Sequence, residues 1–118
     1  HKAGRARPLS NQERRMRAYA ATAVEVAMAA GKSENEAIAE VFDAFTKAGV
    51  KRGRGDTKEE LTCRTIRSWR EDAIGHGSNQ FSMFMIEQVE KQIEKGGKPT
   101  LEVATEIVLG LAKLAARP

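Results

Sequence analysis

The sequence has few cysteines, prolines and aromatic residues, and each shortage excludes a class of protein. One cysteine, Cys63, stands in 118 residues, so no internal disulfide can form and a reducing, cytoplasmic location is expected. Three prolines, one tryptophan, one tyrosine and four phenylalanines disfavour a β-sandwich or barrel, whose strands are rich in aromatic and β-branched residues. The abundant alanines favour helices instead.

Long apolar runs are missing as well. The most apolar stretch, residues 101–116, contains Glu102, Glu106 and Lys113, so it is too short and too charged to span a membrane. No uninterrupted apolar run follows Arg5, Arg7, Arg14, Arg15 and Arg17, so no secretory signal peptide is expected. We therefore expect a cytoplasmic protein that has no membrane partner.

Groups that carry catalysis or bind metals are also scarce. The two histidines, His1 and His76, have no cysteine or second histidine at the spacing of a zinc site. The tripeptide GKS at 31–33 matches only the end of a phosphate-binding loop, because no glycine precedes it at the required distance. The sequence thus predicts no catalytic residue, no metal ligand and no cofactor, and we do not expect an enzyme.

Five helical segments are indicated by capping signals and by apolar periodicity. A hydroxyl stands three residues before a glutamate at Ser10–Glu13, Ser33–Glu36 and Thr57–Glu60, which is the pattern of a capping box at a helix start. The helices predicted in this way cover residues 11–30, 34–48, 58–74, 80–95 and 100–116. We expect an all-α fold, a compact bundle of about five helices without strands. Residues 11–118 would form a single helical domain behind a basic arm at residues 1–10.

The last helix, residues 100–116, is apolar almost all round. A helix of this kind is usually buried on more than one side, and in a domain this small one side is expected to contact a partner subunit. The helix before it, residues 80–95, adds a face rich in phenylalanine and methionine. We therefore expect a homodimer that forms through helices 80–95 and 100–116.

The positive charge of the chain is concentrated in two segments. Residues 1–17 carry six basic side chains and one acidic one, and residues 47–57 carry four basic side chains and one acidic one. Residues 18–46, in contrast, carry one lysine and five acids. A basic arm and a basic loop are typical of contacts with phosphate or another polyanion. A solubilising tail and a solvated loop are the alternative interpretation.

Residues 62–72, TCRTIRSWRED, contain the most distinctive pattern in the chain. At helical spacing, Ile66 and Trp69 point broadly one way, and we expect their face to be buried. Arg64 and Arg67 fall on the opposite side of the helix and are expected to face outward. The pattern predicts a packed helix that presents arginines on its outer face.

The stretch from Thr62 to Trp69 resembles the recognition helix of helix-turn-helix DNA-binding domains, including those of transposases, resolvases and MerR-like regulators. The shared pattern, S/T-x-x-T-V/I-x-x-W, is matched at Thr62, Thr65, Ile66 and Trp69. The resemblance implies that Thr62 caps the helix and that Ile66 and Trp69 anchor it in the core. It also implies that the major groove is faced by Cys63, Arg64, Thr65, Arg67 and Ser68.

The start of this helix has two possible positions. The capping box at Thr57 predicts one continuous helix from Lys58, which makes Thr62 an interior residue. The resemblance instead places the start at Thr62. The outer face also has a second interpretation, because the pairs Glu60–Arg64 and Arg67–Glu71 can form along the helix and leave a solvated face of balanced charge.

We expect a DNA-binding protein, either a transcriptional regulator or a DNA-binding factor of the phage or mobile-element type. Helix 58–74 would contact the major groove, where an arginine can donate two hydrogen bonds to guanine, while the loop and the arm would contact phosphates. Double-stranded DNA is the expected partner, because no aromatic platform interleaves the basic residues. The expected DNA-binding residues are Arg64, Thr65, Arg67, Ser68, Arg70, Lys51, Arg52, Arg54, Lys58, Arg5 and Arg7. The alternative is a helical protein–protein adaptor or regulatory subunit that docks through helices 80–95 and 100–116.

Overall fold

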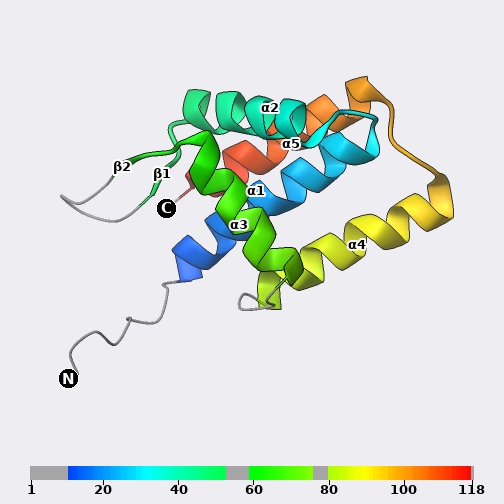
Figure 1. Cartoon of the computed structure of the whole chain (residues 1–118), viewed down its shortest axis with the longest axis horizontal. Helices are drawn as coiled ribbons and strands as arrows, with labels where there is room; N and C mark the ends of the chain where they lie inside the picture. The colour runs from blue at the N-terminus through cyan, green and yellow to red at the C-terminus, as the bar shows by residue number, and fades with distance from the viewer. Residues whose placement is uncertain (1–10, 53–58, 76–79, 118) are drawn as a thin grey trace.

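The computed structural model describes residues 11–52, 59–75 and 80–117 of the chain. Within these residues five helices pack into a bundle, which confirms the expected all-α class (Figure 1). The helices are α1 (Asn11–Ala29), α2 (Glu34–Lys47), α3 (Cys63–Gly75), α4 (Gln80–Gly96) and α5 (Leu101–Ala116). Two short strands, β1 (Lys51–Arg52) and β2 (Glu59–Glu60), lie between α2 and α3.

Helix α1 occupies the centre of the bundle, and each of the other four helices packs against it (Figure 1). Residues 20–24 of α1 are all buried, and five consecutive residues span more than one full turn, so the helix is covered on every side at that level. Its buried surface consists mainly of alanines, including Ala18, Ala20, Ala21, Ala23 and Ala27, each with no exposed area. Such small side chains let several neighbouring helices approach the same helix closely.

The boundaries of α2 follow the sequence signals closely. At its start, the Ser33 hydroxyl accepts from the Glu36 amide at 3.2 Å, and a Glu36 carboxylate oxygen accepts from the Ser33 amide at 3.0 Å. This confirms the capping box at Ser33, and the hydrogen bond from the Ser33 backbone lowers the pKa of Glu36. Ser10 of the first predicted box lies outside the described residues.

Helix α2 ends in a Schellman motif at Gly49. Gly49 has a φ of +88°, a conformation that favours glycine, and its amide donates to the Thr46 carbonyl at 3.0 Å. The Val50 amide donates to the Phe45 carbonyl at 3.0 Å, and both side chains are buried in the core. The turn therefore directs the chain from α2 into β1 with Val50 fixed in the core.

The antiparallel pair of β1 and β2 corrects two sequence-based predictions. Lys51 pairs with Glu60 and Arg52 with Glu59, so the chain contains strands and the helix expected from Lys58 does not begin there. Thr57, the first residue of the third predicted capping box, lies outside the described residues. Leu61 follows β2 directly and is only 4% exposed. Burial of Val50 before β1 and of Leu61 after β2 holds the two strand segments side by side. This burial outweighs the local helix signal of the capping box at Thr57.

Helix α3 begins after Thr62. The Thr62 hydroxyl accepts from the Thr65 amide at 3.1 Å, and the Thr62 carbonyl accepts from the Ile66 amide at 3.2 Å. These are the bonds of a residue at the N-cap position of a helix. The shorter helix start implied by the recognition-helix pattern is therefore correct, and the start at Lys58 is wrong.

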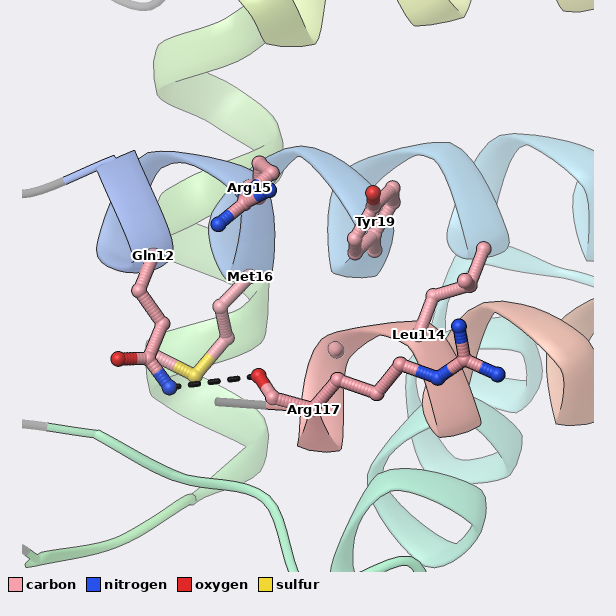
Figure 2. Close-up of a pocket in the computed structure, with 7 residues that line it drawn as sticks. Gln12, Arg15, Met16, Tyr19, Leu114 and Arg117 are labelled. Carbon is pink, nitrogen blue, oxygen red and sulfur yellow. Dashed lines mark hydrogen bonds between the residues drawn. The ribbon is translucent and has the colours of Figure 1, made fainter.

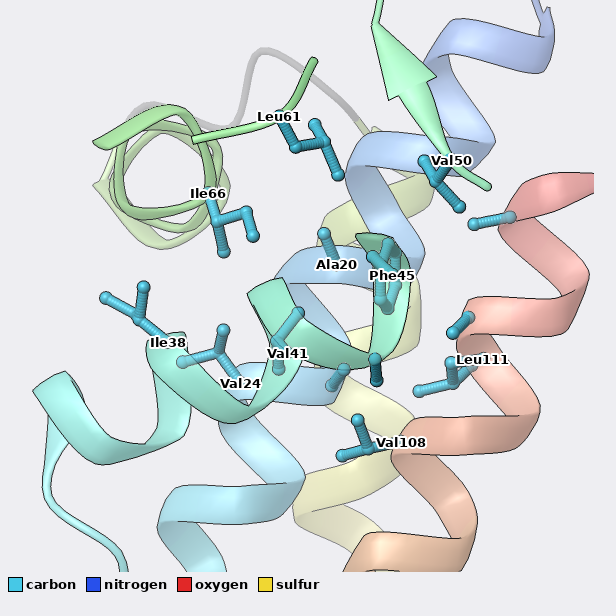
Figure 3. Close-up of a cluster of buried hydrophobic side chains, with 14 of the residues drawn as sticks. Ala20, Val24, Ile38, Val41, Phe45, Val50, Leu61, Ile66, Val108 and Leu111 are labelled. Atoms are coloured by element: carbon cyan, nitrogen blue, oxygen red, sulfur yellow. The ribbon is translucent and has the colours of Figure 1, made fainter. Parts of the chain in front are cut away.

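The main core lies between α1, α2, α3 and α5, and both ends of the hairpin contribute to it (Figure 3). The largest side chains in it with almost no exposed area are Phe45, Ile38, Ile66, Val24, Val41 and Val108. A second, smaller cluster joins Ala21 of α1, Ala73 of α3 and Ile86 of α4. Helix α3 thus contacts both clusters, so its apolar side is held along most of its length.

An ion-pair cluster fixes α3 beside its buried apolar side. The Arg70 Nε donates to Glu25 of α1 at 2.8 Å, and one terminal nitrogen of Arg70 donates to Glu34 of α2 at 2.7 Å. The Arg70 side chain is 12% exposed, so its charge depends on these two carboxylates more than a surface charge would. We call this group of three residues the Arg70 clamp, and it joins α3 to both α1 and α2.

Helix α5 is buried on one side within this chain. Its buried residues are Ala104, Val108, Leu111, Ala112 and Ala115. Its exposed large apolar residues are Leu101, Val103, Ile107, Leu109 and Leu114, each at least 40% accessible. Within this chain α1 is the helix covered on every side, and the expected contact of α5 with a partner subunit stays a prediction. In the part of the chain that the structure describes, no helix has the length and apolar character needed to cross a membrane.

The cap at Thr62 predicts a measurable contribution to stability. Replacing Thr62 with alanine removes the hydroxyl acceptor, and we expect the free energy of unfolding to fall by about 1 kcal/mol. Thr62→Ser keeps the acceptor and should remain close to the wild type. Urea-induced unfolding followed by far-UV circular dichroism compares the variants. An alanine variant as stable as the serine variant would show that the hydroxyl contributes nothing.

The Arg70 clamp predicts a larger effect. Arg70→Met keeps an unbranched side chain but leaves two carboxylates without their donor, so we expect a loss of about 1–3 kcal/mol in the free energy of unfolding. Arg64→Met on the exposed side of the same helix is the matched control and should change stability by less than about 0.5 kcal/mol. Equal effects of the two substitutions in urea unfolding would rule out a structural role for the clamp.

Candidate nucleic-acid interface

The exposed surface of α3 is the face that sequence reasoning assigned to DNA. Ile66, Trp69 and Ala73 are 0%, 7% and 4% exposed, which confirms that the apolar side of the helix is buried. On the outer side, Arg64 and Ser68 are exposed one turn apart. Thr65 is half-buried beside them. The structure therefore brings three of the predicted site residues together in the first half of α3.

The N-terminal end of α3 is open to solvent. Thr62, Cys63 and Arg64 are all exposed, and the first backbone amides of a helix have no acceptor within the helix. The Thr62 and Thr65 hydroxyls are 2.9 Å apart, so one of them can donate a hydrogen bond to the other. The aligned peptide dipoles place partial positive charge at this end, and the Arg64 guanidinium adds a full charge. This end of α3 is suited to contact with a negatively charged group.

The three arginines of α3 have different surroundings. Arg64 is exposed, whereas Arg67 is half-buried and donates from a terminal nitrogen to Oδ1 of Asn35 in the first turn of α2. The Arg67 Nε is buried and has no hydrogen-bond partner among the described residues. Arg70 is held in the clamp. Of the three arginines, Arg64 is therefore the one that is exposed to solvent.

Strand β1, which begins the basic segment, lies next to this end of α3. Figure 1 shows β1 and β2 beside the first turn of α3, and Lys51 of β1 is exposed. Arg52 belongs to β1 by its backbone, and its side chain is not among those described. The remaining predicted phosphate contacts, Arg54, Lys58, Arg5 and Arg7, lie outside the described residues.

Sequence reasoning did not find the residues that position α3. Glu25, Glu34 and Asn35 bind the arginines of α3 from α1 and α2, and they stand 32 to 45 residues away in the sequence. Arg17 of α1 lies over the Trp69 ring, 5.5 Å from its centroid. Neither composition nor spacing shows which acid will meet which arginine, because these pairs form only when α1, α2 and α3 pack together.

A pocket of about 180 Å³ lies between the start of α1 and the end of α5 (Figure 2). It is lined by Gln12, Arg15, Met16, Tyr19, Leu114, Ala115 and Arg117. The Gln12 side chain donates to the Arg117 carbonyl at 3.4 Å and closes one side. The volume is below the range of about 300–1,000 Å³ that is usual for small-molecule sites. None of these lining residues is a carboxylate, a histidine or a cysteine.

The described residues contain no group of three or more His, Cys, Asp or Glu side chains placed to hold a metal ion. Comparisons of the chain with protein families, with curated proteins and with solved structures give no match. The function is therefore inferred from the geometry and charge of this chain alone.

Proposed function

We propose that the protein binds double-stranded DNA through the first half of α3. The observation that carries the proposal is the helix start at Thr62, which leaves the N-terminal turn of α3 exposed with Arg64 on its surface. Arg64, Thr65 and Ser68 would face the major groove. Lys51 of the adjacent strand would contact a phosphate. The same proposal assigns phosphate contacts to Arg52, Arg54, Lys58, Arg5 and Arg7.

The chemistry of these side chains fits that task. A major groove about 12 Å wide admits an α-helix, and the N-terminal residues of a recognition helix are the ones that contact base edges. The guanidinium group of Arg64 can donate two hydrogen bonds to guanine or to a phosphate. A hydroxyl such as that of Ser68 can bond to a base or to the backbone.

Arg67 and Arg70 take a different role in this proposal. Their contacts with Asn35, Glu25 and Glu34 hold α3 on α1 and α2, so they position the exposed residues. In a helix-turn-helix unit a preceding helix gives this support across a short turn. Here residues 48–62, which include the hairpin, separate α2 from α3, so α1 and α2 would support α3 from a distance in the sequence.

Duplex DNA is favoured over a single strand. Proteins that bind single strands usually stack bases on exposed aromatic side chains. Trp69 is 7% exposed and lies under Arg17, so it is unsuited to stacking. Phe84 of α4, at 57% exposed, is the only large exposed aromatic residue among those described, and α4 lies on another part of the molecule (Figure 1).

A protein–protein adaptor or regulatory subunit is the second candidate function. The exposed apolar residues of α5 are the specific observation in its favour, because they form a surface on which another helix could dock. A docking protein of this kind would not require the exposed arginine of α3. The two functions are therefore separated by direct measurement of DNA binding.

We expect the protein to bind a fluorescently labelled random duplex in an anisotropy titration, with an affinity that falls steeply between low and moderate salt. Arg64→Ala should weaken binding to a preferred sequence by about 1–3 kcal/mol, the range of a good bidentate contact to a base. Lys91→Ala, at an exposed position of α4, is the control and should bind like the wild type. Undetectable binding at low salt would overturn the proposed function.

Substitutions in the basic arm should act differently. Replacing both Arg5 and Arg7 with alanine should weaken binding to all duplexes alike, because interactions with phosphate carry no sequence information. The slope of log affinity against log salt should become shallower by about 0.9 for each phosphate that the variant no longer neutralises. An unchanged slope in the double variant would show that the arm does not bind phosphate.

A further inference from the structure

Four residues form an uncovered stripe along α5. Val103, Ile107 and Leu114 are 44%, 40% and 41% exposed, and Gly110 is exposed between them. Their spacing of four, three and four residues places them on one side of the helix, as in helices that pair with another helix. We refer to these four residues as the α5 stripe.

The α5 stripe is distinct from the face that α5 uses within the chain. Among the described residues α5 packs against α1 and α2, and this packing buries Ala104, Ala112 and Ala115 together with Val108 and Leu111. The stripe lies to one side of that face. Three large aliphatic side chains in one line at this degree of exposure would gain stability from burial against another apolar surface.

Gly110 is not explained by the packing of this chain. A side-chain carbon placed on Gly110 would meet nothing within 4 Å, so no neighbouring atom requires a glycine there. A glycine inside a helix is less favourable than alanine. A second helix that approaches closely would account for it, because the missing side chain leaves room for a large residue of the partner.

We propose that the occupant of the α5 stripe is the same stripe of a second copy, with the two helices antiparallel. If the two-fold axis passes between residues 108 and 109, Val103 lies opposite the partner's Leu114. Ile107 then lies opposite the partner's Gly110, and the symmetry repeats both contacts. The stripe is thus complementary to itself, as the interface of a two-fold dimer must be.

The charges beside the stripe support this orientation. Glu102, Glu106 and Lys113 are exposed on one flank of α5. A two-fold antiparallel pair brings this flank against the same flank of the partner, and Lys113 then lies level with the space between the partner's Glu102 and Glu106. Opposite charges would meet twice across the interface. A parallel pair would place Gly110 against the partner's Gly110 and leave a gap between the two stripes.

The interface would be small. The stripe spans about 17 Å at 1.5 Å per residue, so a dimer that dissociates at micromolar or higher concentration is expected. It would also be independent of DNA binding, because α3 packs on α1, α2 and α4 rather than along α5. Dimerisation is therefore measured on the full chain without nucleic acid.

Sedimentation equilibrium between about 10 and 500 μM tests the proposal, and the wild type should shift from monomer toward dimer across that range. Ile107→Glu should raise the dissociation constant at least tenfold. Leu101→Glu is the matched control, since Leu101 is 54% exposed on α5 but lies outside both the stripe and the charged flank, and it should leave association unchanged. A wild type that stays monomeric at 500 μM, or a control that weakens association as much as Ile107→Glu, would overturn the proposal.

Two further variants separate association from folding. Gly110→Leu has open space around it in the monomer, so circular dichroism should show equal or greater thermal stability while dimerisation is abolished. Lys113→Glu should weaken association, and adding Glu102→Lys and Glu106→Lys should restore it by exchanging the charges on both sides. A Gly110→Leu variant that dimerises like the wild type would exclude close antiparallel packing.

Arg64→Ala should sediment like the wild type, so failure of the DNA proposal and failure of the dimer proposal are distinguishable.

Discussion

The packing of four helices around the alanine-rich α1 is the constraint on which the rest of the structure depends. Residues 20–24 of α1 have no exposed side, and only small side chains allow neighbours to approach the same segment from every direction. Because α1 contacts α2, α3, α4 and α5, a larger residue in its centre would displace several helices at once. The position of α3, and of everything it presents to solvent, follows from this arrangement.

The second constraint is electrostatic, and it divides the basic residues of α3 into two groups. Arg70 neutralises acids from α1 and α2 in a partly buried cluster, and Arg67 bonds to the first turn of α2. Arg64 remains exposed at the helix start. A charged side chain on a firmly packed helix is a better candidate for recognition than one on a flexible segment. Binding then costs less conformational entropy.

The basic surface at the start of α3 and the apolar α5 stripe belong to different parts of the molecule. The positive charge at the start of α3 suits contact with a polyanion. The α5 stripe is complementary to itself in shape and charge, which suits contact with another copy of the chain. Neither surface requires the other, since among the described residues α3 and α5 each pack mainly against α1. A protein with both properties would present two copies of α3 from one dimer.

Local sequence signals were sufficient to predict much of the secondary structure. The helix start at Ser33, the turn at Gly49 and the buried side of α3 at Ile66 and Trp69 all depend on residues within one or two turns of each other. Among the candidate site residues, the pattern at 62–69 correctly placed Arg64 and Ser68 on the outer face. Interactions of this range are visible in a single sequence because the helix repeat fixes which residues are neighbours.

Three features were decided only by the tertiary structure. The strands β1 and β2 replaced a helix start that the sequence favoured, because the residues at both ends of the hairpin are buried in a core made by other elements. Helix α1 became the covered helix although α5 is more apolar, because alanine's small size matters more than hydrophobicity where several helices meet. The three arginines of α3 differ in role because Asn35 bonds to Arg67 and because Glu25 and Glu34 bond to Arg70. These contacts form only when α1, α2 and α3 pack together. What the sequence alone determined was thus local geometry, and what the fold decided was which distant groups meet.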